Sequence, residues 1–386
     1  MWLMELRQRL LGRKRRSSGR RPLLARPAKV RLVLEHLEDR TVPSKFTADT
    51  VAALISDISA ANNAGGSNTI TLTAPTYTLS TVDNSTDGPT GLPVIAAGDN
   101  LTIDGNGALL MRSTATGTPA FRFFDVAGGA SLTLNNLILE NGLAIGAGVA
   151  AEGGAIFNQG QLTLSAATLL SNVAQGSDGA AGSGASGQTA AGGAIFSING
   201  SVTATGPTLF QQDRANGGAG GSGTSGGKGG DALGGVIAAV NSTLSFGPGV
   251  LFFRDFEQGG RGGAGGGAGG DAQGGSIWAM GGSVALSGVE LASFIGAGNG
   301  GSGATSGNGG NGGKASGGGL YASDATVTLA NTTMLCSAGD IFSGNGGSGG
   351  KAVLPHGTGG AGGTGGDANG GAITVADRGM MHSWMK

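Results

Sequence analysis

A tetrad of two glycines, a small residue and an aliphatic residue recurs along the chain and limits its fold more than any other feature. Successive tetrads are 39, 42, 40, 43 and 53 residues apart, and they open at Gly153, Gly192, Gly234, Gly274, Gly317 and Gly370. A period of about 40 residues is typical of supersecondary units that bury their apolar faces by stacking on one another. The chain is therefore expected to be a repeat protein.

Each repeat holds two more apolar sites at nearly constant distances from its first glycine. The first is an apolar pair 9 or 10 residues on: Leu162/Leu164, Val202/Ala204, Leu244/Phe246, Val284/Leu286 and Val327/Leu329. The second is one apolar residue 16 or 17 residues on: Leu169, Leu209, Leu251, Leu291 and Met334. Three short strands thus lie in register, and the variation in repeat length falls in the glycine-rich stretch that follows.

Three strands of three to five residues joined by tight turns make one coil of a parallel β-helix, whose strands pair from coil to coil at about 4.8 Å. The predicted fold is all-β, a right-handed parallel β-helix (solenoid) over 47–375 with about eight coils and a length of about 40 Å. A propeller needs four substantial strands per blade, and the glycine stretches supply no fourth. One interior ladder is expected from Ile156, Ile195, Ile237, Ile277 and Leu320.

The best helix candidate, at 47–62, precedes the strands. Val51, Leu54, Ile55 and Ile58 form an apolar stripe, Thr47 or Asp49 is expected to cap the start, and Asn62 and Gly65 are expected to end the helix. Alternating segments at 69–73, 77–79, 101–103 and 132–134 follow it. This order predicts an N-terminal capping helix that covers the first coils of the sheet stack.

Glycine is concentrated in one part of the chain. Of the 83 glycines, 68 lie in 151–386, where five lateral insertions leave the coil at the same point, near 176–191, 217–233, 259–273, 298–316 and 343–369. One interpretation is flexible polar loops. The other is that Gly-Gly-X triplets form extended, polyproline-II-like segments packed side by side. The residues themselves leave both open.

The leader at 1–46 differs in charge from the rest. Residues 1–40 carry 12 Lys/Arg against 4 Asp/Glu, whereas the remaining 346 carry 11 against 20. A flexible tail, a nucleic-acid-binding arm and a targeting segment are the alternatives, and no aromatic residues interleave the arginines to favour the second. Charges interrupt every apolar run that follows, so an ordinary signal peptide is not supported. No segment approaches the length of a membrane span, and we expect no nucleic acid partner.

Two resemblances bear on location and fold. The string Val30 to Ser44, VRLVLEHLEDRTVPS, resembles the "LExLEDRxxPS" leader of large exported or surface proteins of planctomycete bacteria. The GGAI tetrads resemble those of polymorphic outer-membrane proteins, whose FxxN motif is degenerate here, with Asp213 and Asp255 in place of asparagine. Residues 51–72 are similar to the entry segment of bacterial surface β-helix domains. These resemblances imply a pectate-lyase-like β-helix fold and a place at the cell surface.

The sequence lacks the residues that most familiar catalytic and binding sites require. The Walker pattern is absent, since Lys228, Lys314 and Lys351 precede Gly, Ala and Ala. The single cysteine, Cys336, forms neither an intrachain disulfide nor a zinc cluster. The three histidines, His36, His356 and His382, lie outside the coils. We therefore predict no catalytic, cofactor-binding or metal-binding residues and no cofactor.

Carboxylates supply the enzymatic alternative. Asp213, Arg254, Asp255 and Glu257 fall at the equivalent corner of neighbouring coils, where they are expected to form either a catalytic cluster or, as we favour, a solvated row of turn residues. The insertion tails share a second set, Asp231, Asp271 and Asp367, with Lys314 in place of aspartate in a fourth. One acid per repeat is too few for a calcium β-roll, although isolated weak calcium sites stay open.

The tail at 376–386 departs from the repeat. It holds three of the eight methionines and one of the three tryptophans, where a second apolar pair is expected near residue 380. We expect a truncated or frame-shifted end, or alternatively a tail that folds back as a plug.

The function expected for the whole chain is that of a non-enzymatic, exported structural or adhesin-like protein, whose partner is a surface polysaccharide or another copy. The alternative is a polysaccharide lyase or glycosidase.

Overall fold

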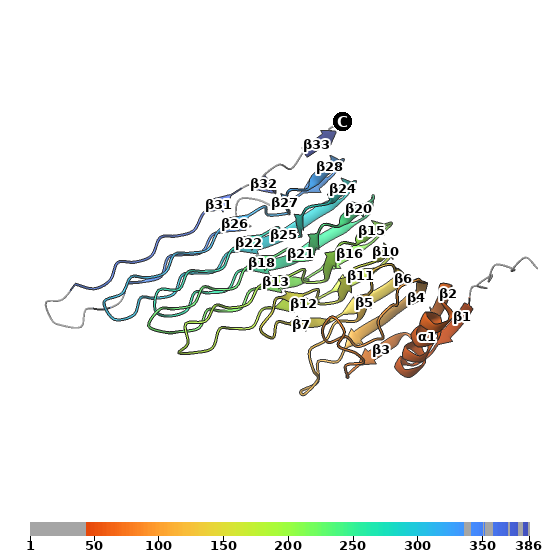
Figure 1. Cartoon of the computed structure of the whole chain (residues 1–386). Coiled ribbons are helices and arrows are strands. Elements are labelled where there is room, and N and C mark those ends of the chain that lie inside the picture. Colours follow the sequence, from red (N-terminus) through yellow and green to blue (C-terminus); the bar gives the residue numbers. More distant parts are fainter. Residues whose placement is uncertain are drawn as a thin grey trace, which may run out of the picture. The chain divides into compact units, whose positions relative to one another are not determined.

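The chain is seen in a computed structural model that describes residues 44–335, 341–349, 351, 358–369, 371–376 and 381–384. Its strands stack in parallel as successive coils (Figure 1). The predicted all-β parallel β-helix is confirmed. The predicted leader, apart from 44–46, and Cys336, His36 and His356 lie outside the described residues.

One row of strands runs along the whole stack. Its ten described members pair in parallel, each with the next. They are β1 (Ser44–Ala48), β2 (Gly66–Leu72), β4 (Asp99–Arg112), β6 (Ser131–Glu140), β10 (Gln161–Ser165), β15 (Ser201–Thr205), β20 (Thr243–Phe246), β24 (Ser283–Ser287), β28 (Thr326–Ala330) and β33 (Met381–Trp384). This row exceeds the eight coils expected because β1 and β33 extend it at its two ends.

Two further rows continue each coil, the second of them not foreseen. The first comprises β3 (Thr76–Leu79), the later halves of β4 and β6, β11 (Thr168–Leu170), β16 (Leu209–Gln211), β21 (Leu251–Gln258), β25 (Glu290–Gly296) and β29 (Thr333–Met334). The other comprises β7 (Leu143–Ile145), β12 (Val173–Gln175), β17 (Arg214–Asn216), the ends of β21 and β25, and β30 (Ile341–Phe342).

Two separate sheets complete the coil around the Gly-Gly tetrads. The strands at the tetrads are β9 (Ile156–Asn158), β14 (Ile195–Ile198), β19 (Ile237–Val240), β23 (Ile277–Met280), β27 (Leu320–Ser323) and β32 (Ile373–Ala376). β5 (Phe124–Val126), which comes before the first tetrad, pairs with β9 in the same sheet. The strands before the tetrads are β8 (Ala151–Glu152), β13 (Ala190–Ala191), β18 (Ala232–Leu233), β22 (Ala272–Gln273), β26 (Ala315–Ser316) and β31 (Ala368–Asn369).

The predicted interior ladder is confirmed. Ile156, Ile195, Ile237, Ile277 and Leu320 pair in unbroken register and are completely buried. The apolar pairs of the first row also stack inward and join the same core. Since inward positions recur every second residue, each strand contributes one or two side chains to this core.

The prediction for the third apolar site is wrong by one residue in two coils. Phe210 and Phe252, not Leu209 and Leu251, are completely buried, and Leu169 pairs with Phe210. The two rings stack with centroids 4.6 Å apart. Both coils carry an extra residue in the preceding turn, and a shift of one residue turns every side chain of a strand to its other face.

The predicted capping helix is present as α1 (Val51–Ala64), beside β1 at the N-terminal end of the stack (Figure 1). Thr50 caps its start instead of Thr47 or Asp49, because these two residues lie in and directly after β1. Gly65 ends it by donating its N–H to the carbonyl of Ala61 at 2.9 Å. Leu54, Ile58 and Ala61 are completely buried in the main core.

The five glycine-rich insertions form stacked ribs that extend away from the strands (Figure 1). Each rib has an outgoing and a returning limb, and we call the ribs together the glycine layer and the rest the strand body. Outgoing limbs bond to one another every third residue, since the N–H groups of Gly217, Gly220 and Gly223 donate to the carbonyls of Gln258, Arg261 and Ala264. This three-residue period is that of polyproline II. The interpretation as flexible loops is therefore wrong.

Outgoing and returning limbs also bond to each other. Gly218 donates to Gln188 of the preceding returning limb at 2.9 Å, and Gly230 donates to Gly218 at 2.7 Å. A Cβ added at Gly218, Gly230 or Gly260 would overlap a backbone carbonyl of a neighbouring limb. The two glycines of each triplet thus pack directly against the backbone of other limbs. Only the third position, X, has room for a side chain.

At the C-terminal end, the backbone continues the repeat where a departure was expected. β33 pairs with β28, with Met381 opposite Val327 and Trp384 opposite Ala330. The tail thus adds strand β33 to the first row, although its composition departs from the repeat. Gly370 and residues 377–380 lie outside the described residues.

Candidate functional site

The four candidate residues at the coil corner do not form a solvated row, so that expectation is wrong. Asp213, Asp255 and Glu257 are each completely buried. Only Arg254 is exposed, with its guanidinium 5.1 Å from the ring centroid of Phe253. The cause is the left-handed φ of 58° at Arg254, which turns the chain so that the next side chain, Asp255, points inward.

The buried aspartates belong to a hydrogen-bonded ladder that follows the stack. Asn172 accepts from the N–H of Gly142 at 2.9 Å, Asp213 accepts from the N–H of Asn172 at 2.8 Å, and Asp255 accepts from the N–H of Asp213 at 3.0 Å. Each side chain thus satisfies a backbone donor one coil away. This explains the degenerate FxxN motif. The aromatic residue and the Asn or Asp of the motif both point inward, and each packs against the residue at the same position in the next coil.

Burial alters the titration of these acids. Desolvation raises the pKa of Asp213 to about 7, although hydrogen bonds from Asn172 oppose the shift. Desolvation, with the adjacent Asp213 carboxyl, raises the pKa of Asp255 well above its usual value. The second carboxyl oxygen of each has no hydrogen-bond partner. Both observations favour a neutral carboxyl in the folded protein.

Glu257 lies apart from this ladder, near the base of the glycine layer. Its Oε1 accepts from the N–H of Gln273 at 2.6 Å, and its Oε2 has no partner. Desolvation raises its pKa well above the usual value. All three acids therefore act as internal structural groups, and none is exposed to a dissolved polymer.

A further buried charged group lies around Arg122, and no sequence motif marks it. Arg122, which is 5% exposed, lies 5.0 Å from the ring centroid of Phe157 and donates to the carbonyl of Asp87 at 3.0 Å. Asp125 is fully buried nearby, and desolvation raises its pKa to about 6. Glu152 also interacts electrostatically with Arg122. Asp87, Glu152 and Phe157 lie 30 or more residues from Arg122 in the sequence and share no motif with it, so no local pattern groups them.

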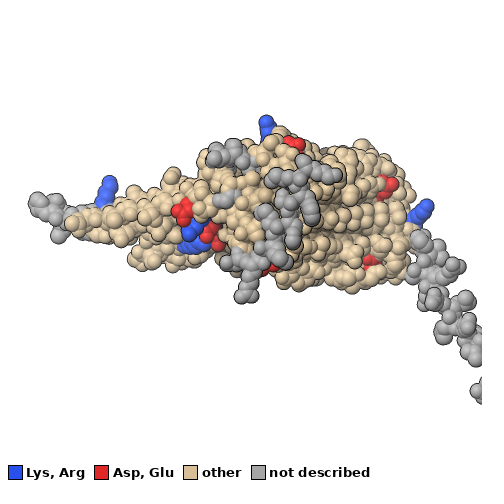
Figure 2. All heavy atoms as spheres, turned by 90° about the horizontal axis from the view of Figure 1, so that it is seen from above, with Lys and Arg blue, Asp and Glu red and all other residues tan. Residues whose placement is uncertain are grey.

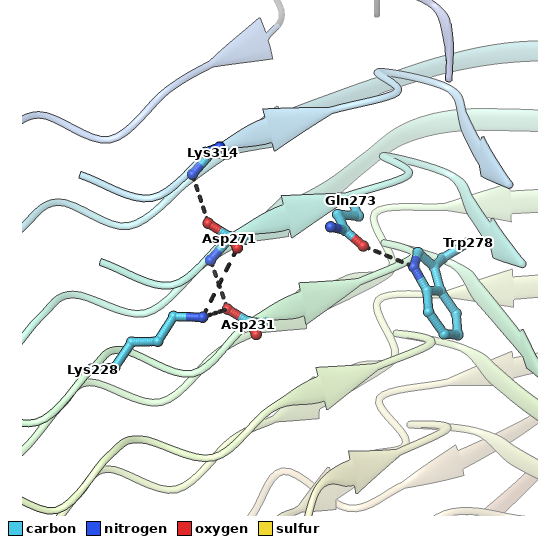
Figure 3. Close-up of polar contacts among 6 residues, drawn as sticks. All are labelled: Lys228, Asp231, Asp271, Gln273, Trp278 and Lys314. Carbon is cyan, nitrogen blue, oxygen red and sulfur yellow. Dashed lines mark hydrogen bonds and ion pairs between the residues drawn. The ribbon is translucent and has the colours of Figure 1, made fainter. Parts of the chain in front are cut away.

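The acids of the insertion tails line up at X positions of the returning limbs (Figure 3). Asp231 accepts from the N–H of Asp271 at 2.8 Å, and Asp271 accepts from the N–H of Lys314 at 2.8 Å. Lys228 bridges the two acids, with Nζ 2.7 Å from Asp231 and 3.9 Å from Asp271. Asp367 continues the column, 3.6 Å from the Lys314 ammonium.

This column has a structural explanation. The glycines of a triplet donate to other limbs, which leaves the X-position N–H free, and a short Asp or Asn side chain one coil earlier accepts it. Asn308 and Asn311 do the same for Ala361 and Thr364, at 2.9 and 3.0 Å. Within the described residues, no group of three or more His, Cys, Asp or Glu is arranged to hold a metal ion.

Comparison with known proteins gives no relative. No family model matches the chain, and no curated protein and no solved structure matches it either. Among the helices in the described ranges, none has the length and apolar character needed to cross a bilayer.

Proposed function

We propose that this chain is a non-enzymatic, exported structural or adhesin-like protein of the cell surface or extracellular matrix. The observation that carries the proposal is the burial of Asp213, Asp255 and Glu257, the strongest catalytic candidates in the sequence. A general acid or base must come within hydrogen-bond reach of its substrate, whereas these three bond to backbone groups of adjacent coils or limbs.

The surface also supports a role in contact with other molecules. Charged side chains are few and scattered on the face seen in Figure 2, and charged residues make up 12% of the whole chain. The glycine layer adds a broad lateral surface without adding a core. The export part of the proposal rests on the resemblance of the leader at 30–44.

The test is activity on a panel of neutral and acidic polysaccharides, measured as reducing-sugar release and as ultraviolet absorbance of unsaturated products. We expect no turnover above a protein-free control. Asp255→Asn is the matched variant, because Asn172 occupies the equivalent position in the ladder. Turnover by the natural chain that Asp255→Asn abolishes would overturn the proposal.

Location needs its own experiment. Antibodies against the folded chain should label intact cells of the source bacterium, and surface protease treatment should remove the signal. Labelling confined to permeabilised cells would contradict the proposed surface location.

A further inference from the structure

A hollow of about 480 Å³ lies where the strand body meets the glycine layer in the C-terminal coils. It exists because one column of outward side chains is interrupted. Asn216 pairs with Gln258, Gln258 with Gly296, and Gly296 with Phe342. Every member but Gly296 has a side chain, so the space above Gly296 is open between Gln258 and Phe342.

Two aromatic rings line this space, and a third lies beside them. Phe342 is 55% exposed and lines the hollow, together with the half-buried Phe256. Phe294, 40% exposed, pairs with Phe256 in the adjacent column. A group of large apolar side chains exposed together at a surface often marks an interaction site.

The polar groups at the hollow are neutral amides and a hydroxyl. Gln258 donates to the carbonyl of Gly296 at 3.2 Å, which fixes the amide at the rim. Asn299 accepts from the N–H of Asn345 at 2.8 Å, and both side chains are exposed. None of the residues lining the hollow is charged. The hollow therefore offers no opposite charge to a bound carboxylate, phosphate or metal ion.

We propose that this hollow binds a neutral sugar unit of a polysaccharide. A pyranose presents a C–H face, which suits the exposed ring of Phe342 and the half-buried ring of Phe256. It also presents a rim of hydroxyls, which suits the amides of Gln258, Asn299 and Asn345. The lining combines two aromatic rings with neutral polar groups, as a ligand with both a C–H face and a rim of hydroxyls requires. The inference rests on the adhesin-like function proposed above and names its ligand class.

The experiment is saturation-transfer NMR with the full chain and neutral hexasaccharides of glucose, mannose, xylose and N-acetylglucosamine, with hexagalacturonate as the acidic comparison. We expect transfer to ring C–H protons of at least one of them. Gly296→Asn should weaken binding at least tenfold by placing a side chain in the open position between Gln258 and Phe342. A Cβ at Gly296 makes only ordinary contacts, 3.4 Å from Gln258, and Asn216 already occupies this column, so the variant should fold.

Gly247→Asn is the matched control. Gly247 lines a separate hollow of about 230 Å³ against the first row of strands, and a Cβ there lies 3.8 Å from its nearest neighbour. This control should bind like the natural chain, and Phe342→Ala should weaken binding as Gly296→Asn does. Melting curves show whether each variant is folded.

Three results would overturn the inference. The natural chain binds none of the neutral sugars, it binds only acidic ones, or Gly296→Asn and Phe342→Ala both bind undiminished. Turnover of a bound sugar, in contrast, would overturn the proposed non-enzymatic function and leave the binding site in place.

Discussion

The strand body and the glycine layer stack along the same axis by the same coil-to-coil pairing, but they are packed in opposite ways. In the strand body, side chains such as Ile237 fill the interior. In the glycine layer, positions such as Gly260 admit no Cβ, because neighbouring backbones occupy that space. Close packing is thus reached once with side chains and once without them.

The difference has an energetic consequence. The strand body gains about 1.5–3 kcal/mol from each fully buried aliphatic side chain. The glycine layer buries almost no side chains, and glycine loses more backbone freedom on folding than any other residue. The layer therefore depends on its hydrogen bonds and on the strands that hold its two ends. It should open locally before the strand body unfolds.

The largest effect is expected from a charge in the strand body. Ile237→Asp would bury an unpaired carboxylate and cost about 4 kcal/mol or more. Ala264→Asp places the same side chain at an exposed X position of the glycine layer and should cost little. Thermal melting followed by circular dichroism compares the two. Equal melting of Ile237→Asp and the natural chain would mean that the inward register is wrong.

The buried acids predict an unusual pH dependence. Asp213 and Asp255 have folded-state pKa values above the unfolded value of about 4, so the folded state binds more protons between the two values. The contribution of these protons to the free energy of unfolding is complete below about pH 4. It is lost as the pH rises toward 7, by on the order of 4 kcal/mol for Asp213. Denaturant unfolding at several pH values measures this.

The double variant Asp213→Asn, Asp255→Asn serves as the control for the pH effect. It keeps the acceptor oxygens of the ladder and removes the titration, so its stability should change less between pH 4 and 7. Stability that rises over this range in the natural chain would contradict the prediction.

A smaller effect is expected within the glycine layer. Gly260→Ala should cost about 1–3 kcal/mol, the usual cost of overpacking, because the methyl group would overlap the carbonyl of Gly218. Arg261→Ala, at the next and exposed position, should be nearly neutral. Hydrogen exchange should show faster exchange in the neighbouring ribs for Gly260→Ala only. Unchanged protection there would mean that the limbs are not packed as described.

The smallest effect concerns the charged column. Asp271→Ala removes the acceptor of the Lys314 N–H and should cost about 1 kcal/mol. Asp271→Asn keeps that acceptor and loses only the ion pair with Lys228 at 3.9 Å, which is worth less than about 1 kcal/mol at an exposed site. Chemical denaturation separates the two. Equal losses would assign the role of Asp271 to its charge.

The parts of the fold that depend on a fixed spacing could be predicted from the sequence. The ladder through Ile156 and Ile237 followed from the tetrad. Phe210 and Phe252 were missed because one extra turn residue reverses the faces of a strand. The corner acids were expected to be exposed to solvent because an aspartate in a turn usually is exposed. Their burial depends on backbone donors one coil away, about 40 residues distant in the chain, and no local pattern reports such a partner.

The three-residue period of the ribs also determines how this protein can change over generations. Each limb presents the same hydrogen-bonding groups after every Gly-Gly-X triplet, as the spacing of Gly217, Gly220 and Gly223 shows. Nine added nucleotides in each limb would lengthen a rib and keep every glycine facing backbone. A single added codon would move an X side chain into a position that has no room for it. Changes in limb length are therefore expected to come in whole triplets.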